Sequence, residues 1–203
     1  MIERISRKIT NRLLLKKVIK QEDWEIYQYG VYQLITNVVH IITLLILGVI
    51  FNEVWQGIIF VLTFVILRVY AGGYHAPTPL KCYLLTTSII IAILSVMKYV
   101  EIDYFICFIL LIISSIVILI FSPVESENKP LDMMEKMIYR RKTFMIWGIE
   151  TGVAVVCAIL KVKSVLICIT MAEVVLCCAL ISEVIKQKTK KDVRRKFNEK
   201  RFF

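Results

Sequence analysis

The chain has 203 residues, of which 58% are hydrophobic and 21% are charged, and its mean hydropathy is +0.72. The apolar residues form long runs without the alternation of β-strands, which excludes a soluble two-layer domain and a β-barrel. Seven glycines and four prolines are too few for a linker-rich or collagen-like chain. We therefore predict an all-α, polytopic integral membrane protein.

The net charge of +10 comes from basic residues that flank the apolar runs. Lysine and arginine at such boundaries usually set the topology of a membrane protein. A nucleic-acid partner is not expected, because no basic stripe is interleaved with aromatic residues on a soluble module. Membrane lipids are the expected partner of these basic ends.

Residues 1–25 form a basic, amphipathic segment. Ile2, Ile5, Ile9 and Leu13 recur at spacings of three and four, with arginine and lysine between them. This pattern predicts a helix that lies in the membrane interface. A solvated basic tail that only sets the orientation is the alternative.

Residues 26–185 form the predicted membrane domain, and the basic tail 186–203 follows as a helix or a disordered segment. A short turn at Asn52 and Glu53 and a charged loop at 125–142 interrupt the apolar runs. The predicted spans lie at about 30–50, 54–70, 83–100, 104–124, 144–160 and 164–185. The uncharged part of the second run is shorter than the roughly 20 residues that a span needs, so 54–70 and 83–100 could instead form a re-entrant pair.

The distribution of positive charge predicts the sidedness. Six spans put both termini on one side, and 23 of the 26 lysines and arginines then fall there. The other three are Lys98, Lys161 and Lys163. This bias predicts a multi-pass membrane protein with both termini and the loop at 68–82 in the cytoplasm.

That loop, from Arg68 to Cys82, concentrates the reactive residue types. Cys82 is the one cysteine of six that borders a polar segment, whereas the other five lie in apolar runs. Thr78 and Pro79 are typical of an N-cap and a first helical position, which places Cys82 in the first turn of a helix. The helix dipole and Lys81 would both favour a thiolate there.

His75 is the candidate base for this thiol, because an imidazole exchanges protons near neutral pH. Gly72 and Gly73 let the backbone approach closely, either for substrate passage or to offer N–H groups to an oxyanion. A chance histidine and cysteine in an interfacial turn would look the same, because an isolated His–Cys pair is weak evidence.

The same segment resembles the accessory gene regulator protein B (AgrB) family of bacterial membrane cysteine peptidases, which process a quorum-sensing propeptide. The matching pattern is Arg68, then Gly72-Gly73-Tyr74-His75-Ala76, then Cys82 seven residues after the histidine. The length, the basic termini and the number of apolar runs match as well.

The resemblance implies a chemistry for these residues. Cys82 would attack a carbonyl near the C-terminal part of a short amphipathic propeptide, with His75 as base and then acid. A thiol or hydroxyl of the peptide would displace Cys82 and close a thiolactone or lactone ring. Arg68 would hold a substrate carboxylate or support the fold, and no cofactor is implied.

Residues inside the spans suggest two further hypotheses and one expected absence. His40 and Glu173 lie at similar predicted depths, which permits a hydrogen-bonded pair within the bundle. Gly148 and Gly152 form a Gly-x-x-x-Gly motif, typical of a close helix contact within the protein or between two copies of a homodimer. A metal site is not expected, because the chain has two histidines at different predicted depths.

A non-enzymatic membrane transporter or a component of a sensor assembly is the alternative function. Such a protein would use His40, Glu150 and Glu173, which are ionisable groups within spans. It would tolerate the change Cys82→Ala and fail with Glu173→Gln, whereas the peptidase would show the reverse.

Overall fold

The computed structural model describes residues 2–74, 76, 78–125 and 131–199. The described chain is helical, and six of its helices are long and apolar enough to cross a membrane. These six are α2 (Trp24–Phe51), α3 (Val54–Ala71), α4 (Pro79–Tyr99), α5 (Tyr104–Phe121), α6 (Met133–Ile159) and α7 (Lys163–Glu199). The prediction of an all-α polytopic protein is confirmed.

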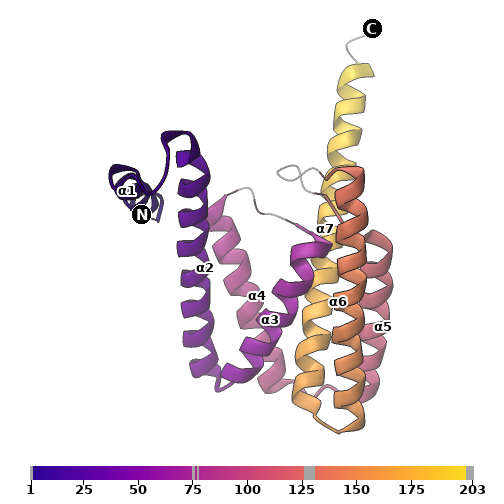
Figure 1. The fold of residues 1–203 in the computed structure, drawn as a ribbon. Coiled ribbons are helices and arrows are strands. Elements are labelled where there is room, and N and C mark those ends of the chain that lie inside the picture. Colours follow the sequence, from indigo (N-terminus) through magenta and orange to yellow (C-terminus); the bar gives the residue numbers. More distant parts are fainter. Residues whose placement is uncertain (1, 75, 77, 126–130, 200–203) are drawn as a thin grey trace.

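Helices α3 and α4 run in opposite directions along the length of the bundle (Figure 1). They contain 18 and 21 residues, so both are long enough to span. Six crossings therefore fit the structure, and a re-entrant pair at 54–70 and 83–100 does not. The predicted turn between α2 and α3 is present, with Asn52 in the left-handed conformation at φ +59°.

Both termini lie at one end of the bundle, together with the connection between α3 and α4 (Figure 1). The three lysines predicted for the opposite side, Lys98, Lys161 and Lys163, lie at the turns of the other end. The basic residues predicted which segments lie on the same side of the membrane, and the fold places these segments at the same end of the bundle.

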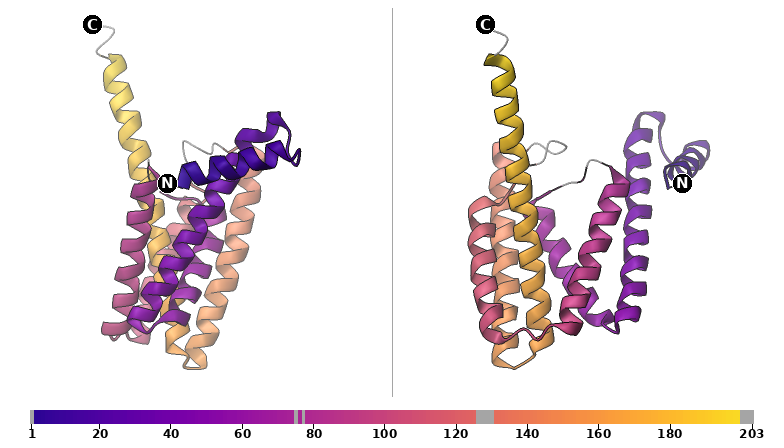
Figure 2. Two further views of the ribbon diagram at one scale, coloured as in Figure 1. Left: turned by 90° about the vertical axis from the view of Figure 1, so that its left-hand side faces the viewer. Right: turned by 180° about the vertical axis from the view of Figure 1, so that it is seen from behind.

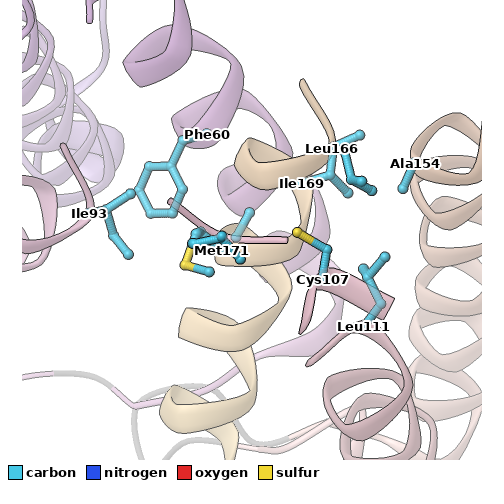
Figure 3. Packing of buried hydrophobic residues seen from close by; sticks show 10 residues of the cluster. Phe60, Ile93, Cys107, Leu111, Ala154, Leu166, Ile169 and Met171 are labelled. Atoms are coloured by element: carbon cyan, nitrogen blue, oxygen red, sulfur yellow. The ribbon is translucent and has the colours of Figure 1, made fainter. Parts of the chain in front are cut away.

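Helix α7 forms the centre of the bundle. Most of its apolar segment is buried, whereas less than a quarter of the apolar segment of each of the other five spanning helices is buried, as expected for lipid-facing helices. The main apolar core brings α7 together with α3, α4, α5 and α6 (Figure 3). Its buried members include Phe60, Ile93, Leu111, Ala154 and Leu166.

The N-terminal helix α1 (Ile2–Leu15) lies across the direction of α2 (Figure 2). Small polar side chains make its contact with α2, because Ser6 and Thr10 are buried and Gln28 donates to the Ser6 hydroxyl at 3.5 Å. Ile5 and Ile9 are exposed, so the apolar stripe is free to meet lipid. The helix ends at Leu15, ten residues before the predicted boundary, and the short helix η1 (Gln21–Asp23) follows.

Two sequence predictions about α6 are wrong. The predicted loop at 125–142 is helical from Met133, because Asp132 and Glu135 form a capping box that starts the helix before the apolar run. Gly148 and Gly152 make no close helix contact within the chain, since a Cβ at either would meet nothing within 4 Å. A contact with a second copy is the part of that hypothesis that stays open.

Candidate functional site

The connection from α3 to α4 begins with a tightly packed glycine pair. Gly72 has φ +80° and Gly73 has φ +128°, a region that favours glycine. A Cβ at Gly72 would lie 2.2 Å from the carbonyl oxygen of Val124. Gly73 packs against Ala179 of α7, where a Cβ would lie 3.3 Å from the Ala179 Cβ. The two glycines therefore let the chain leave α3 between the end of α5 and α7.

Backbone hydrogen bonds hold this segment in place. The Gly72 N–H donates to the Arg68 carbonyl at 3.0 Å, and the Tyr74 N–H donates to the Ala179 carbonyl at 3.0 Å. On the other side, the Val124 N–H donates to the Ala71 carbonyl at 3.0 Å. Because the Gly72 N–H is already bonded within α3, it is not available to an oxyanion in this conformation. The role of Gly72 in the structure is to shape the backbone.

Arg68 lies in the last turn of α3 and faces the same segment. Its guanidinium group donates to the Tyr74 carbonyl and lies 5.3 Å from the centre of the Phe64 ring. Arg68 thus holds the start of the connection against the end of α3.

Cys82 occupies the first turn of α4, as predicted. Thr78 is the N-cap in an extended conformation, and its hydroxyl accepts the Lys81 N–H at 3.3 Å. The Cys82 N–H donates to the Thr78 carbonyl at 3.0 Å, and the cysteine is half-buried. The cysteine therefore lies near the positive end of a helix dipole.

The candidate base, His75, lies outside the described residues. The residues on either side of it, Tyr74 and Ala76, are described, and Tyr74 is held by α7 and by Arg68. The described residues place Arg68, Gly72 and Gly73 at the end of α3 and Cys82 at the start of α4, on the two sides of the connection.

His40 lies beside α4, not beside Glu173. Its ring centre is 5.4 Å from that of Tyr83, the residue after Cys82, and its Nδ1 lies 2.8 Å from the Thr36 carbonyl. The Tyr83 hydroxyl is 2.9 Å from the Thr43 hydroxyl. The predicted pair of His40 and Glu173 is wrong, because similar depth on two helices does not bring their faces together.

Glu173 has its own partners deep in the bundle. Its carboxylate accepts hydrogen bonds from Ser114 and Ser115 of α5 at 3.3 Å each and from Thr151 of α6 at 3.1 Å. Trp147 donates to the Ser115 hydroxyl at 3.0 Å. These contacts join three helices through one buried acid, which accounts for Glu173 without a transported ion.

Sequence reasoning missed the part of α7 that supports the site. Glu183, one turn after Ala179, is buried, and its Oε2 lies 3.5 Å from the Lys186 ammonium. That ammonium is 5.1 Å from the centre of the Tyr74 ring. An acidic residue inside an apolar run was the available signal for Glu183, whereas nothing marks Ala179. Among the described residues, no cluster of three or more His, Cys, Asp or Glu side chains could hold a metal ion.

Comparison with known proteins shows the family of the chain. The family model described as Accessory gene regulator B matches residues 2–184. The chain belongs to the accessory gene regulator B (AgrB) family. The resemblance predicted from the segment between Arg68 and Cys82 is thereby confirmed, and membership implies involvement in the peptide processing of accessory gene regulator quorum sensing.

Two relatives illustrate how far the AgrB likeness extends. Putative AgrB-like protein 2 of Clostridium perfringens (strain 13 / Type A) is 35% identical over 143 residues, which are 67% of this chain and 67% of that protein. Accessory gene regulator protein B of Staphylococcus aureus (strain Newman) is 30% identical over 117 residues, which are 58% of this chain and 61% of that protein. No solved structure gives a significant match.

Proposed function

We propose that this AgrB-family protein is a membrane-embedded cysteine endopeptidase and cyclase that acts on a short quorum-sensing propeptide. The observation that carries the proposal is the position of Cys82. It is half-buried in the first turn of α4, and its helix begins at a formed Thr78 cap that places it near the positive end of the helix dipole. A nucleophilic cysteine requires this kind of accessible and electropositive environment.

The first half of the proposed reaction is acyl transfer to the enzyme. His75 takes the proton of the Cys82 thiol, and the thiolate attacks a peptide carbonyl of the propeptide. A carbon–sulfur bond forms, the peptide carbon–nitrogen bond breaks, and the imidazolium of His75 protonates the leaving amine. The N-terminal part of the peptide then remains on Cys82 as a thioester.

The second half is ring closure. A thiol or hydroxyl within the same peptide loses its proton to His75 and attacks the thioester carbonyl. The bond to Cys82 breaks, the sulfur recovers a proton, and a cyclic thiolactone or lactone is released. A tethered nucleophile has a high effective concentration, so ring closure outruns hydrolysis where the site limits access of water.

The proposed location of this chemistry is the cytoplasmic face of the membrane. The connection between α3 and α4 lies at the end that holds both termini (Figure 1). The same end carries the large majority of the lysines and arginines. The positive-inside bias makes it the cytoplasmic end. The amphipathic start of the propeptide would lie on the inner leaflet beside α1.

Co-expression with the propeptide tests the proposed nucleophile. We expect Cys82→Ala to abolish cleavage, with a loss of at least about a thousandfold, because the covalent step disappears. His75→Ala should have the same effect. The matched control is Cys157→Ala, which removes another half-buried cysteine that lies in α6, far along the chain from the site.

The readout is the tagged propeptide on a gel, together with the mass of the released ring. Continued cleavage by Cys82→Ala would refute the mechanism. Loss of cleavage in Cys82→Ala with normal cleavage in Cys157→Ala would support it, provided that both variants reach the membrane in equal amounts.

A further inference from the structure

One face of α2 is polar over several turns, although the helix is a membrane span. We call Tyr29, Tyr32, Gln33, Thr36, His40 and Thr43 the polar stripe of α2. Their spacings of three and four residues place them on one face of the helix. The opposite face carries exposed apolar residues at the same depths, such as Leu34, Val38 and Ile42. A helix with this pattern turns one face to lipid and the other to a polar environment.

Contacts at the far end of the polar stripe, which is the end away from the loop between α3 and α4, show which way the stripe faces. His40 and Thr43 contact Tyr83 of α4, and the next turn of α2 places Leu44 in an apolar cluster with Ile90 and Leu94 of α4. The polar stripe therefore faces the protein side, toward the helix that carries Cys82. The contact is made at Tyr83, the residue that follows Cys82 in the sequence.

Nearer the loop end, the polar stripe loses its protein cover. Tyr29 is 68% exposed and Gln33 is exposed as well. At that end α2 and α4 stand apart from α3 and α7 in both Figure 1 and the right-hand view of Figure 2. Tyr29 and Gln33 thus present exposed hydrogen-bonding groups on this side of α2, where the Gln33 amide donates to Asn37 of the same helix at 3.1 Å.

His40, at the far end of the polar stripe, holds a buried hydrogen-bond acceptor without a partner among the described residues. The Nδ1 of His40 lies 2.8 Å from the Thr36 carbonyl, which can only accept, so Nδ1 carries the proton. In the neutral ring the Nε2 is then an acceptor, and this buried atom has no hydrogen-bond partner among the described residues. An uncompensated buried acceptor is costly, and an N–H group of a ligand would satisfy it once the side chains that cover the atom move aside.

We propose that the polar stripe of α2 binds the uncharged part of the peptide substrate that lies next to the scissile bond. No formal charge occurs between Ile26 and Asn52, so the stripe offers amide, hydroxyl and imidazole groups that suit a peptide backbone. Tyr29 and His40 are eleven residues apart, about 16 Å along a helix, which matches about five residues of an extended peptide. The inference rests on the proposed function, because it assigns part of the substrate site.

Photocrosslinking tests the inference in the full chain, reconstituted in lipid nanodiscs. Cys82→Ser keeps the substrate intact, and benzoylphenylalanine is introduced in place of Gln33 or, separately, of Tyr29. The probe is the fluorescent propeptide that the unmodified protein processes. We expect both positions to form adducts with it. Leu34 and Val38, on the opposite face at the same depth, are the matched controls and should form none.

Kinetics give a second readout in the catalytically active protein. Gln33→Leu should raise KM about three- to tenfold and change kcat less than twofold, because it removes a binding contact of about one hydrogen bond. Gln33→Asn should restore part of the loss, which a purely structural role of Gln33 would not predict.

Adducts from both faces, or from Leu34 and Val38 alone, would overturn the inference. So would the absence of adducts at the stripe when the same propeptide is processed by the unmodified protein. The proposed function fails separately. If Cys82→Ala still cleaves while the stripe forms adducts, the peptide site stands and the nucleophile is wrong.

Discussion

At the scale of single residues, Gly72 shows why a glycine stands directly after α3. Its φ of +80° lies in the left-handed half of backbone space, and its Cα faces the Val124 carbonyl so closely that no side chain fits. The same close approach permits the hydrogen bond from the Val124 N–H to Ala71. Gly72 therefore couples the path of the chain toward Cys82 to the segment after α5.

Gly72→Ala tests this coupling. The new Cβ would lie 2.2 Å from a backbone oxygen at an unfavourable φ, so we expect a loss of at least about 2 kcal/mol in unfolding free energy and loss of peptide cleavage. Unfolding in detergent micelles and propeptide cleavage are the measurements.

Gly30→Ala is the control, since a Cβ there meets nothing within 4 Å and the residue lies in a helix. It should leave stability unchanged or raise it slightly, because alanine favours a helix more than glycine does. Equal stability of Gly72→Ala and the unmodified protein would contradict the steric argument.

At the scale of elements, the hydroxyls of α5 and α6 meet on the Glu173 carboxylate of α7. An acid at this depth is tolerated because Ser114, Ser115 and Thr151 supply its hydrogen bonds. The arrangement joins three helices through hydrogen bonds. Apolar side chains alone would gain little free energy by exchanging contacts with lipid for contacts with another helix. It also explains why Glu173 faces α5 and α6, away from α2.

A pair of double-mutant cycles separates the observed contact from the one that was predicted. Glu173→Gln combined with Thr151→Val should show a coupling of about 0.6 kcal/mol, the usual size for a hydrogen bond between membrane helices. Glu173→Gln combined with His40→Ala should be additive. The measurement is unfolding in mixed micelles, and coupling in the second cycle alone would contradict the packing described above.

These variants also address the alternative of a transporter. A transporter that used Glu173 would lose its function in Glu173→Gln and keep it in Cys82→Ala. A peptidase should retain cleavage in Glu173→Gln to the extent that the bundle stays folded, because Glu173 makes no contact with the described residues of the site.

At the scale of the whole molecule, the basic residues and the fold agree on which segments share a side. The helices alternate in direction, so six crossings bring the termini and the α3–α4 connection to one end (Figure 1). The far end carries Lys98, Lys161 and Lys163, with the Lys98 ammonium 5.9 Å from the centre of the Phe51 ring. The proposed chemistry would thereby be confined to one face of the membrane.

Cysteine labelling in intact bacteria tests the orientation. Glu101→Cys, at the turn between α4 and α5, should react with an impermeant maleimide added outside the cells. Glu22→Cys, in η1, should react only after the membrane is opened. Both native residues are exposed or lie in short connections, so the substitutions should preserve the fold. Labelling of Glu22→Cys in closed cells would reverse the proposed orientation.

The sequence by itself determined the helical membrane class, the positions of the six apolar runs and the start of α4 after the Thr78 cap. These features are local, because hydropathy over a run and a cap next to a proline act within a few residues. The early start of α6 was also encoded locally, in Asp132 and Glu135. The charged residues of the segment 125–142 led instead to the prediction of a loop.

Only the tertiary structure decided which residues meet across helices. It placed His40 on Tyr83 and Glu173 on three hydroxyls, and it assigned Ala179 and Val124 to hold the chain after α3. Such pairings depend on the rotation and tilt of each helix, which arise from packing summed over the whole bundle. A run of apolar letters specifies that a helix crosses the membrane, but it does not specify which face of that helix another helix will cover.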